Sequence, residues 1–143
     1  MINSRQKGKR GEREFVHFLR DRGEVARRGV QFAGGPESPD VICETLPTIH
    51  FEIKFAKRVD ITAAMLQACN DCPQGKFRVV AWKETGKRAP WMATMKADEF
   101  CELFNNVSDL KDSLKFFLTK NRDLLVTLLA DQWHDLIKTM RVL

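Results

Sequence analysis

A run of alternating side chains at residues 48–56 constrains the fold of this chain more than any other feature. Apolar residues occupy every second position, and polar or charged residues lie between them: Ile49, Phe51, Ile53 and Phe55 against His50, Glu52 and Lys54. Successive side chains of a β-strand point to opposite faces, so the run predicts a strand with one face in the core. Glu52 and Lys54 then project together from the other face, held in place by the packing of their neighbours.

A second acid, Asp40, stands at the start of another predicted strand in the motif Pro39-Asp40-Val41-Ile42. Taken alone, Asp40 is typical of a turn, and Glu52 with Lys54 is typical of a salt bridge on an exposed sheet face. Together they supply two carboxylates and a cation. Hard cations such as Mg²⁺ bind oxygen ligands, and phosphodiester cleavage requires positive charge near the phosphate. The three residues therefore predict a divalent-metal nuclease site.

Glu12 is a further candidate because of its place on a helix predicted over residues 11–22. The apolar face of this helix contains Phe15, Phe18 and Leu19. At 100° per residue, Glu12 lies about 50° from the centre of that face and Glu14 about 110° away. An acid near a buried face is costly unless it is paired or metal-bound, so Glu12 is a candidate metal ligand or partner of a ligand. The alternative is a first-turn acid that complements the helix dipole.

Length and composition predict one domain in the cytoplasm. The chain has 143 residues, 43% of them hydrophobic, which is enough for one core and too little for two ordinary domains. No apolar run approaches the roughly 18 residues of a membrane span, and the basic N-terminus lacks a following apolar segment, so we expect no membrane association and no export. The four cysteines are expected to be reduced, and Cys69-x-x-Cys72 lacks the second pair that a zinc site requires.

The net charge is concentrated at the N-terminus. Residues 1–28 contain nine basic and four acidic side chains and so account for the whole net charge of +5. A basic N-terminal arm on an otherwise neutral domain suits contact with a phosphate backbone, although a solvated tail would have the same composition.

The remaining patterns predict a single mixed α/β sheet flanked by helices. Strands are expected over residues 25–32, 39–43, 48–56, 76–82 and 90–95, with a helix over 60–71 between the third and fourth. Beyond residue 97 the pattern is helical: residues 98–105, then 108–118, then a longer helix capped by Asn121. We therefore divide the chain into a nuclease domain, 1–105, and a C-terminal helical extension, 106–143, packed on the core or on a second subunit.

Four motifs occur in an order that resembles a known nuclease superfamily. They are Lys7-Gly8-Lys9-Arg10-Gly11-Glu12-Arg13-Glu14, Pro39-Asp40-Val41-Ile42, Glu52-Ile53-Lys54, and Gln67 on the following helix. The series resembles the PD-(D/E)xK nucleases and, within them, the archaeal-type Holliday junction resolvases and their phage relatives. The resemblance spans about two thirds of the chain.

This resemblance implies a restriction-endonuclease-like core and Mg²⁺-dependent DNA hydrolysis, with Mn²⁺ as a substitute metal. Glu12, Asp40 and Glu52 would hold one or two Mg²⁺ ions, with the Ile53 carbonyl as a further ligand. Lys54 would orient the attacking water, as a cation that stabilises the phosphate or as a neutral base, and both roles remain open. Gln67 would align the lysine or the water.

The resemblance also implies a homodimer that cuts two opposed strands of a four-way junction during DNA recombination and repair. It would act at the nucleoid, or in the host cytoplasm if phage-encoded. The loop over residues 33–38 would move over the cleaved strand. Recognition would use phosphates and junction shape. The expected DNA contacts are Arg5, Lys7, Lys9, Arg10, Arg13, Arg27, Arg28, Ser38, Lys57 and Arg58.

Three other functions are compatible with the same sequence. The first is a restriction-like or repair nuclease acting on duplex, flap or single-stranded DNA. The second is a non-catalytic nucleic-acid-binding module in which the acids form structural salt bridges. The third is a helical adaptor that binds another protein through the apolar stripe of its C-terminal helix.

Overall fold

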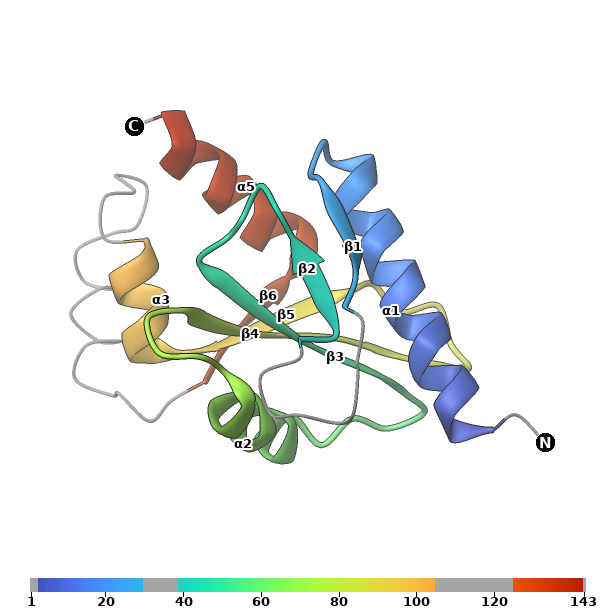
Figure 1. The fold of residues 1–143 in the computed structure, drawn as a ribbon. Coiled ribbons are helices and arrows are strands. Elements are labelled where there is room, and N and C mark those ends of the chain that lie inside the picture. The colour runs from blue at the N-terminus through green and yellow to red at the C-terminus, as the bar shows by residue number, and fades with distance from the viewer. Residues whose placement is uncertain (1–2, 30–38, 105–124, 143) are drawn as a thin grey trace.

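The computed structural model describes residues 3–29, 39–104 and 125–142. The elements are α1 (Ser4–Asp21), β1 (Ala26–Arg28), β2 (Val41–Cys43), β3 (Ile49–Ala56), α2 (Ile61–Asp71), β4 (Phe77–Glu84), β5 (Met92–Lys96), α3 (Ala97–Leu103), β6 (Leu125–Leu129) and α5 (Ala130–Val142). The strands form one sheet in chain order, from β1 at one edge to β6 at the other (Figure 1). The predicted fold class, a single mixed sheet flanked by helices, is confirmed.

The described sheet is antiparallel except at its centre, where β3 and β4 run parallel. Parallel neighbours need a crossover connection, and α2 supplies it. In the parallel register Glu52 lies beside Val80 and Lys54 beside Trp82. In the antiparallel pair Val41 lies beside Phe51, so Asp40, one residue earlier, falls next to the middle of β3.

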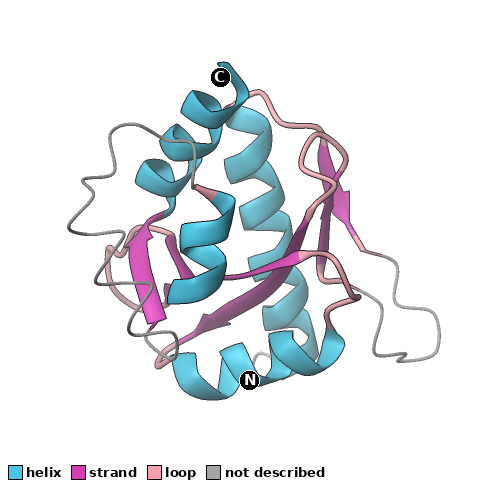
Figure 2. Cartoon of the chain, turned by 90° about the vertical axis from the view of Figure 1, so that its left-hand side faces the viewer, coloured by secondary structure: helices cyan, strands magenta, loops and turns pink. Residues whose placement is uncertain are grey.

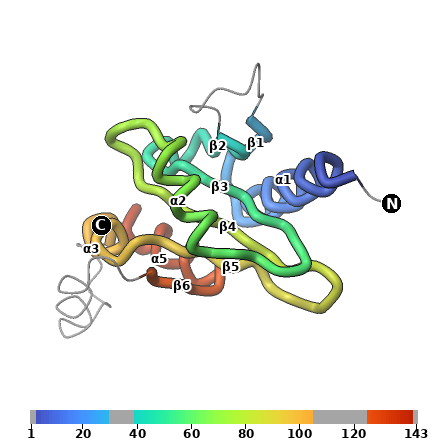
Figure 3. Tube along the Cα trace, turned by 90° about the horizontal axis from the view of Figure 1, so that it is seen from below, coloured from blue at the N-terminus to red at the C-terminus, as the bar shows by residue number. Residues whose placement is uncertain are grey.

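Helices cover both faces of this sheet. α2 lies on one face, where its residues Ala64, Met65 and Ala68 pack on Val80, while α1, α3 and α5 contribute to the larger core on the other face. Figure 1 shows α2 below the sheet, α5 above it and α1 along its right-hand side. Figure 2 shows the layers from the side, and Figure 3 shows α2 lying across the strands. The face of β3 that bears Glu52 is therefore covered, and Glu52 is only 4% exposed. This burial rules out the alternative of an exposed sheet salt bridge.

The basic N-terminal arm is part of α1 rather than a separate tail. The helix was predicted to begin at residue 11, but it begins at Ser4, and the Asn3 side chain caps it by accepting from the Arg5 amide at 3.1 Å. Gly8 and Gly11 lower the helical propensity of this segment, which is why its sequence alone does not predict the earlier start. Glu12 is consequently in the middle of α1, which rules out the first-turn alternative.

The prediction of one continuous helix from Asn121 is wrong at residues 125–129. These residues form β6, which pairs antiparallel with β5 in the register Met92 to Leu129, and the helix α5 begins only at Ala130. The leucines have helical spacing, but β5 offers unpaired backbone groups, and pairing with that edge overrides local propensity. In α5 itself, Trp133 and Ile137 are buried as the apolar stripe predicted.

Several predictions fall outside the described residues: Ser38, the loop over 33–38, and the helix over 108–118. The division of the chain after residue 105 stays a prediction. In the described ranges, no helix combines the length and the apolarity that crossing a membrane would require.

Candidate active site

Glu52, Lys54 and Gln67 form a chain of direct contacts. Alternation along β3 places the first two on the face covered by α2, and Gln67 reaches them from that helix. The Lys54 Nζ lies 3.0 Å from Glu52 Oε1 and donates a hydrogen bond of 2.7 Å to Gln67 Oε1. The three residues that the sequence grouped by spacing and by resemblance are thus brought together in space.

Backbone hydrogen bonds hold Asp40 beside Glu52 and Lys54. Its Oδ2 accepts a hydrogen bond of 2.9 Å from the Ile53 amide, which lies between Glu52 and Lys54 in β3. On its other side, the Gly29 amide donates to the Asp40 carbonyl oxygen at 2.9 Å. A Cβ on Gly29 would overlap the carbonyl oxygen of Pro39, so only glycine permits this close approach of the two segments.

Burial and the charges of neighbouring acids raise the pKa of both carboxyl groups. Burial is the largest cause that raises the pKa of Glu52, the charge of Asp40 raises it further, and Lys54 only partly opposes them, so the pKa is about 7. Burial also raises the pKa of Asp40; the Ile53 amide opposes this shift, and Glu12 adds to it. A cation bound beside these acids would stabilise their ionised forms.

Glu12 approaches the same acids from α1 but is held by an arginine. Its Oε2 accepts from the Arg28 guanidinium at 2.8 Å, and its side chain is 17% exposed. Glu14 is 34% exposed and pairs with Lys83, so the predicted inward tilt of Glu12 and outward tilt of Glu14 agree with the structure. Glu12 acts on Asp40 electrostatically, as the raised pKa of Asp40 records.

The carboxylate oxygens of this site suit a hard divalent cation, but fewer side chains converge on it than the sequence predicted. Among the described residues, no three His, Cys, Asp or Glu side chains converge closely enough to hold a metal ion. The half-buried Asp40 and the buried Glu52 supply two carboxylates whose repulsion a cation would relieve. Glu12 is held in its ion pair with Arg28 and does not complete a group of three converging acids among the described residues.

The basic residues predicted to bind DNA fall into two groups. Those on α1 are mostly exposed: Arg5, Lys9, Arg10 and Arg13, with Lys7 half-buried. In β1, Arg27 pairs with Glu44 at 3.6 Å and Arg28 pairs with Glu12, so these two cations are already partly compensated. Lys57 and Arg58 are exposed in the loop that follows β3.

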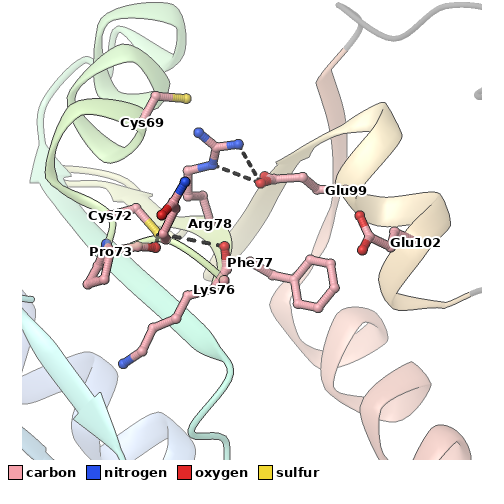
Figure 4. Close-up of a pocket in the computed structure, with 10 residues that line it drawn as sticks. Cys69, Cys72, Pro73, Lys76, Phe77, Arg78, Glu99 and Glu102 are labelled. Carbon is pink, nitrogen blue, oxygen red and sulfur yellow. Dashed lines mark hydrogen bonds and ion pairs between the residues drawn. The ribbon is translucent and has the colours of Figure 1, made fainter.

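Cys69 and Cys72 line a different cavity, of about 420 Å³, at the start of β4. Figure 4 shows Arg78 and Glu99 facing each other there, joined by a hydrogen bond of 2.8 Å from Nε to Oε1. The Cys72 thiol donates to the Pro73 carbonyl at 3.3 Å, and both cysteines are free thiols, as expected. This cavity shares no lining residue with the acidic site.

A mixed sheet carries Glu52 and Lys54 on its central strand β3, with Asp40 beside them, as the resemblance to restriction-endonuclease-like nucleases implied. Residues 3–69, which include all five predicted catalytic side chains, match the family model of the archaeal Holliday junction resolvases, Hjc. Over these residues the chain is similar to that family, and the resemblance predicted from its motifs is confirmed. One similar solved structure is described as the 1.6 Å structure of Archaeoglobus fulgidus Hjc, a Holliday junction resolvase from an archaeal hyperthermophile. It is 28% identical, covers 61% of this chain and 70% of that chain, and has a TM-score of 0.42. A comparison with curated proteins finds no match.

The structure gives three residues of the site a role that the sequence did not predict. The expected DNA contact of Arg28 stays a prediction, and its ion pair with Glu12 was not predicted. Gly29 had no predicted role, although a glycine just before a predicted loop was the available signal. Asp71, at the end of α2, raises the pKa of both Asp40 and Glu52 through its charge. That proximity follows from the crossover of α2, which places the end of the helix near β3.

Proposed function

We propose that this chain is a metal-dependent, structure-selective DNA endonuclease that resolves four-way junctions by paired phosphodiester hydrolysis. The observation that carries the proposal is the contact chain from Glu52 through Lys54 to Gln67, with Asp40 hydrogen-bonded between the first two. The family match over residues 3–69 supports junctions as the substrate class.

The residues of this chain would divide the chemistry between metal binding and charge stabilisation. Asp40 and Glu52, with the Ile53 carbonyl and with Glu12 as a nearby acid, would hold Mg²⁺ or Mn²⁺. Bound there, the cation supplies Lewis acidity and lowers the pKa of its water. The two carboxylates would hold this charge beside the phosphate, and the contact with the Ile53 amide keeps the Asp40 carboxylate in place.

Lys54 would place positive charge where the phosphate gains negative charge in the transition state. Its Nζ lies 3.0 Å from Glu52 Oε1, so it stands beside the acids that would hold the metal. Gln67 accepts a hydrogen bond from Nζ and limits the positions that this flexible side chain can occupy. Gln67 is therefore a positioning residue.

Paired cleavage requires two active sites, so we propose a homodimer that cuts opposed strands of branched DNA in the cytoplasm. The exposed cations of α1 would bind phosphates, which gives affinity without reading bases. Sedimentation of the chain alone and with a junction would measure the assembly. A chain that stays monomeric in both would contradict paired cleavage.

Cleavage of a synthetic four-way junction and of linear duplex, with and without Mg²⁺, tests the function. We expect paired nicks in the junction, slower cutting of duplex, and loss of cleavage in Asp40→Asn and in Glu52→Gln. Glu102→Gln removes an exposed carboxylate that lines the cavity near Cys72, and it is the matched control that should cut normally.

The possible outcomes separate the competing functions. Equal cutting of junction and duplex would replace the resolvase assignment with that of a general DNA nuclease. Normal DNA affinity without cleavage, and without Mg²⁺ or Mn²⁺ binding by calorimetry, would indicate a non-catalytic binding module.

A further inference from the structure

Two adjoining grooves lead away from Lys54 along the edge where β3 and β4 end. The first, of about 200 Å³, begins at Lys54 and Gln67 and continues to Arg58 and Val59. The second, of about 480 Å³, shares Arg58 and Val59 and extends to Lys87 in the turn between β4 and β5. The shared residues make the two grooves neighbours, so they form one path that starts at the proposed catalytic lysine.

The parallel pairing of β3 and β4 explains why this path exists. Ala56 lies beside Glu84 at the end of the register, and the Thr85 amide donates to the Ala56 carbonyl at 2.9 Å. The segments that follow both strands therefore emerge at the same edge of the sheet. Gly86, with φ of 83°, permits the tight turn that presents Lys87.

The charge of the path is net positive. Four cations line the two grooves: Lys54, Lys57, Arg58 and Lys87. The two acids that line them are both engaged. Asp60 caps α2 through the Ala63 amide at 3.0 Å, and Glu84 pairs with Lys87 at 2.6 Å. Lys57 and Arg58 are exposed and make no ion pair within the described part of the chain.

We propose that this path binds the sugar-phosphate backbone of the DNA strand on one side of the cleaved bond, with Arg58 at its middle and Lys87 as its outer phosphate contact. None of the lining side chains is aromatic, so the path offers charge to phosphates and no ring for base stacking. Binding there is independent of base sequence. The inference deepens the proposed function and adds Lys87 to the expected DNA contacts.

Junction binding measured over a range of salt concentrations without divalent metal tests the path. Each phosphate contact that is lost should lower the slope of log K against log salt by about one. We expect Lys87→Ala and Arg58→Ala each to weaken binding several-fold with that change in slope, and Lys87→Glu to weaken it more. Glu84→Gln, which releases Lys87 from its ion pair, should strengthen binding. Lys138→Ala, at an exposed position on α5, is the matched control and should bind as the unmodified chain does.

This experiment tests the DNA-binding path independently of the proposed nuclease activity. Unchanged affinity and slope in both Lys87→Ala and Arg58→Ala would overturn the path even if the unmodified chain cuts junctions. If the unmodified chain cuts no DNA but the two variants show reduced slopes of log K against log salt, the DNA-binding path is supported and the proposed function is overturned. Circular dichroism of each variant identifies loss of binding that comes from misfolding.

Discussion

At the scale of single residues, Lys54 is placed by two partners rather than one. Its side chain is 33% exposed, whereas that of Glu52 is 5% exposed, so the ion pair lies at the boundary between the core and solvent. The contacts with Glu52 and Gln67 hold Lys54 from two sides. They matter because they fix the position of Nζ, the atom that would face the phosphate.

Removing Gln67 should affect the rate of cleavage more than DNA binding. Loss of a residue that orients a catalytic group typically costs about 10–100-fold in activity, so we expect that decrease in kcat for Gln67→Ala with little change in KM. Gln67→Glu keeps an acceptor oxygen for Lys54 and should recover most of the rate. Gln74→Ala, the same change at an exposed position, is the control. A decrease confined to KM would show instead that Gln67 binds substrate.

At the scale of secondary structure elements, the approach of α1 to β3 depends on a glycine. A Cβ on Gly11 would overlap the Cβ of Phe55, close to the backbone of β3, whereas one on Gly8 would meet nothing within 4 Å. The two glycines lie one turn apart on the same helix. Comparing a substitution at each glycine therefore separates the effect of helical propensity from the effect of packing.

We expect opposite effects of alanine at these two positions. Gly8→Ala should raise the free energy of unfolding by about 0.5–1 kcal/mol, because alanine favours the helix. Gly11→Ala gains the same propensity but must push α1 away from Phe55, and such overpacking costs about 1–3 kcal/mol. Urea unfolding monitored by tryptophan fluorescence measures both. Stabilisation by Gly11→Ala would show that α1 can shift without cost.

The same scale shows what sequence could and could not predict. Alternation along β3 predicted the strand, and with it the shared face of Glu52 and Lys54, because side-chain direction in a strand follows from position alone. The β6 strand was missed because its leucines also have helical spacing, and only the free edge of β5 decides between the two. Likewise, the helical wheel predicted the tilt of Glu12, but its pairing with Arg28 requires the tertiary arrangement of α1 and β1.

At the scale of the whole molecule, one buried carboxylate joins three distant segments. Glu24 follows α1, and its side chain is 1% exposed. It accepts hydrogen bonds from Thr45 in the segment between β2 and β3, from His134 Nε2 at 2.9 Å and from Arg141 Nη1 at 2.7 Å, the last two on α5. The C-terminal helix is thus tied to the nuclease core through a polar cluster as well as through its apolar face.

This cluster makes the free energy of unfolding depend on pH in the acidic range. Burial acts to raise the pKa of Glu24, but the hydrogen bonds from Arg141, Thr45 and His134 together outweigh it and lower the pKa from 4.5 to about 2. The unfolded chain therefore binds the proton more readily than the folded chain does. The contribution of Glu24 is complete above about pH 4.5 and is lost as the pH falls towards 2. Its full size is about 3 kcal/mol, at 1.36 kcal/mol per pKa unit.

Urea unfolding at a series of pH values from 6 to 2, for the unmodified chain and for Glu24→Gln, measures this contribution. The difference in the free energy of unfolding between the two should be largest near neutral pH and should shrink below about pH 4.5, because the other acids titrate in both chains and cancel in the difference. Glu44→Gln, at an exposed acid in a long ion pair of 3.6 Å with Arg27, should give a small difference with little pH dependence. A Glu24 difference that stayed constant down to pH 2 would show that the cluster acts through hydrogen bonds that do not need the charge, and that α5 is held by its apolar face.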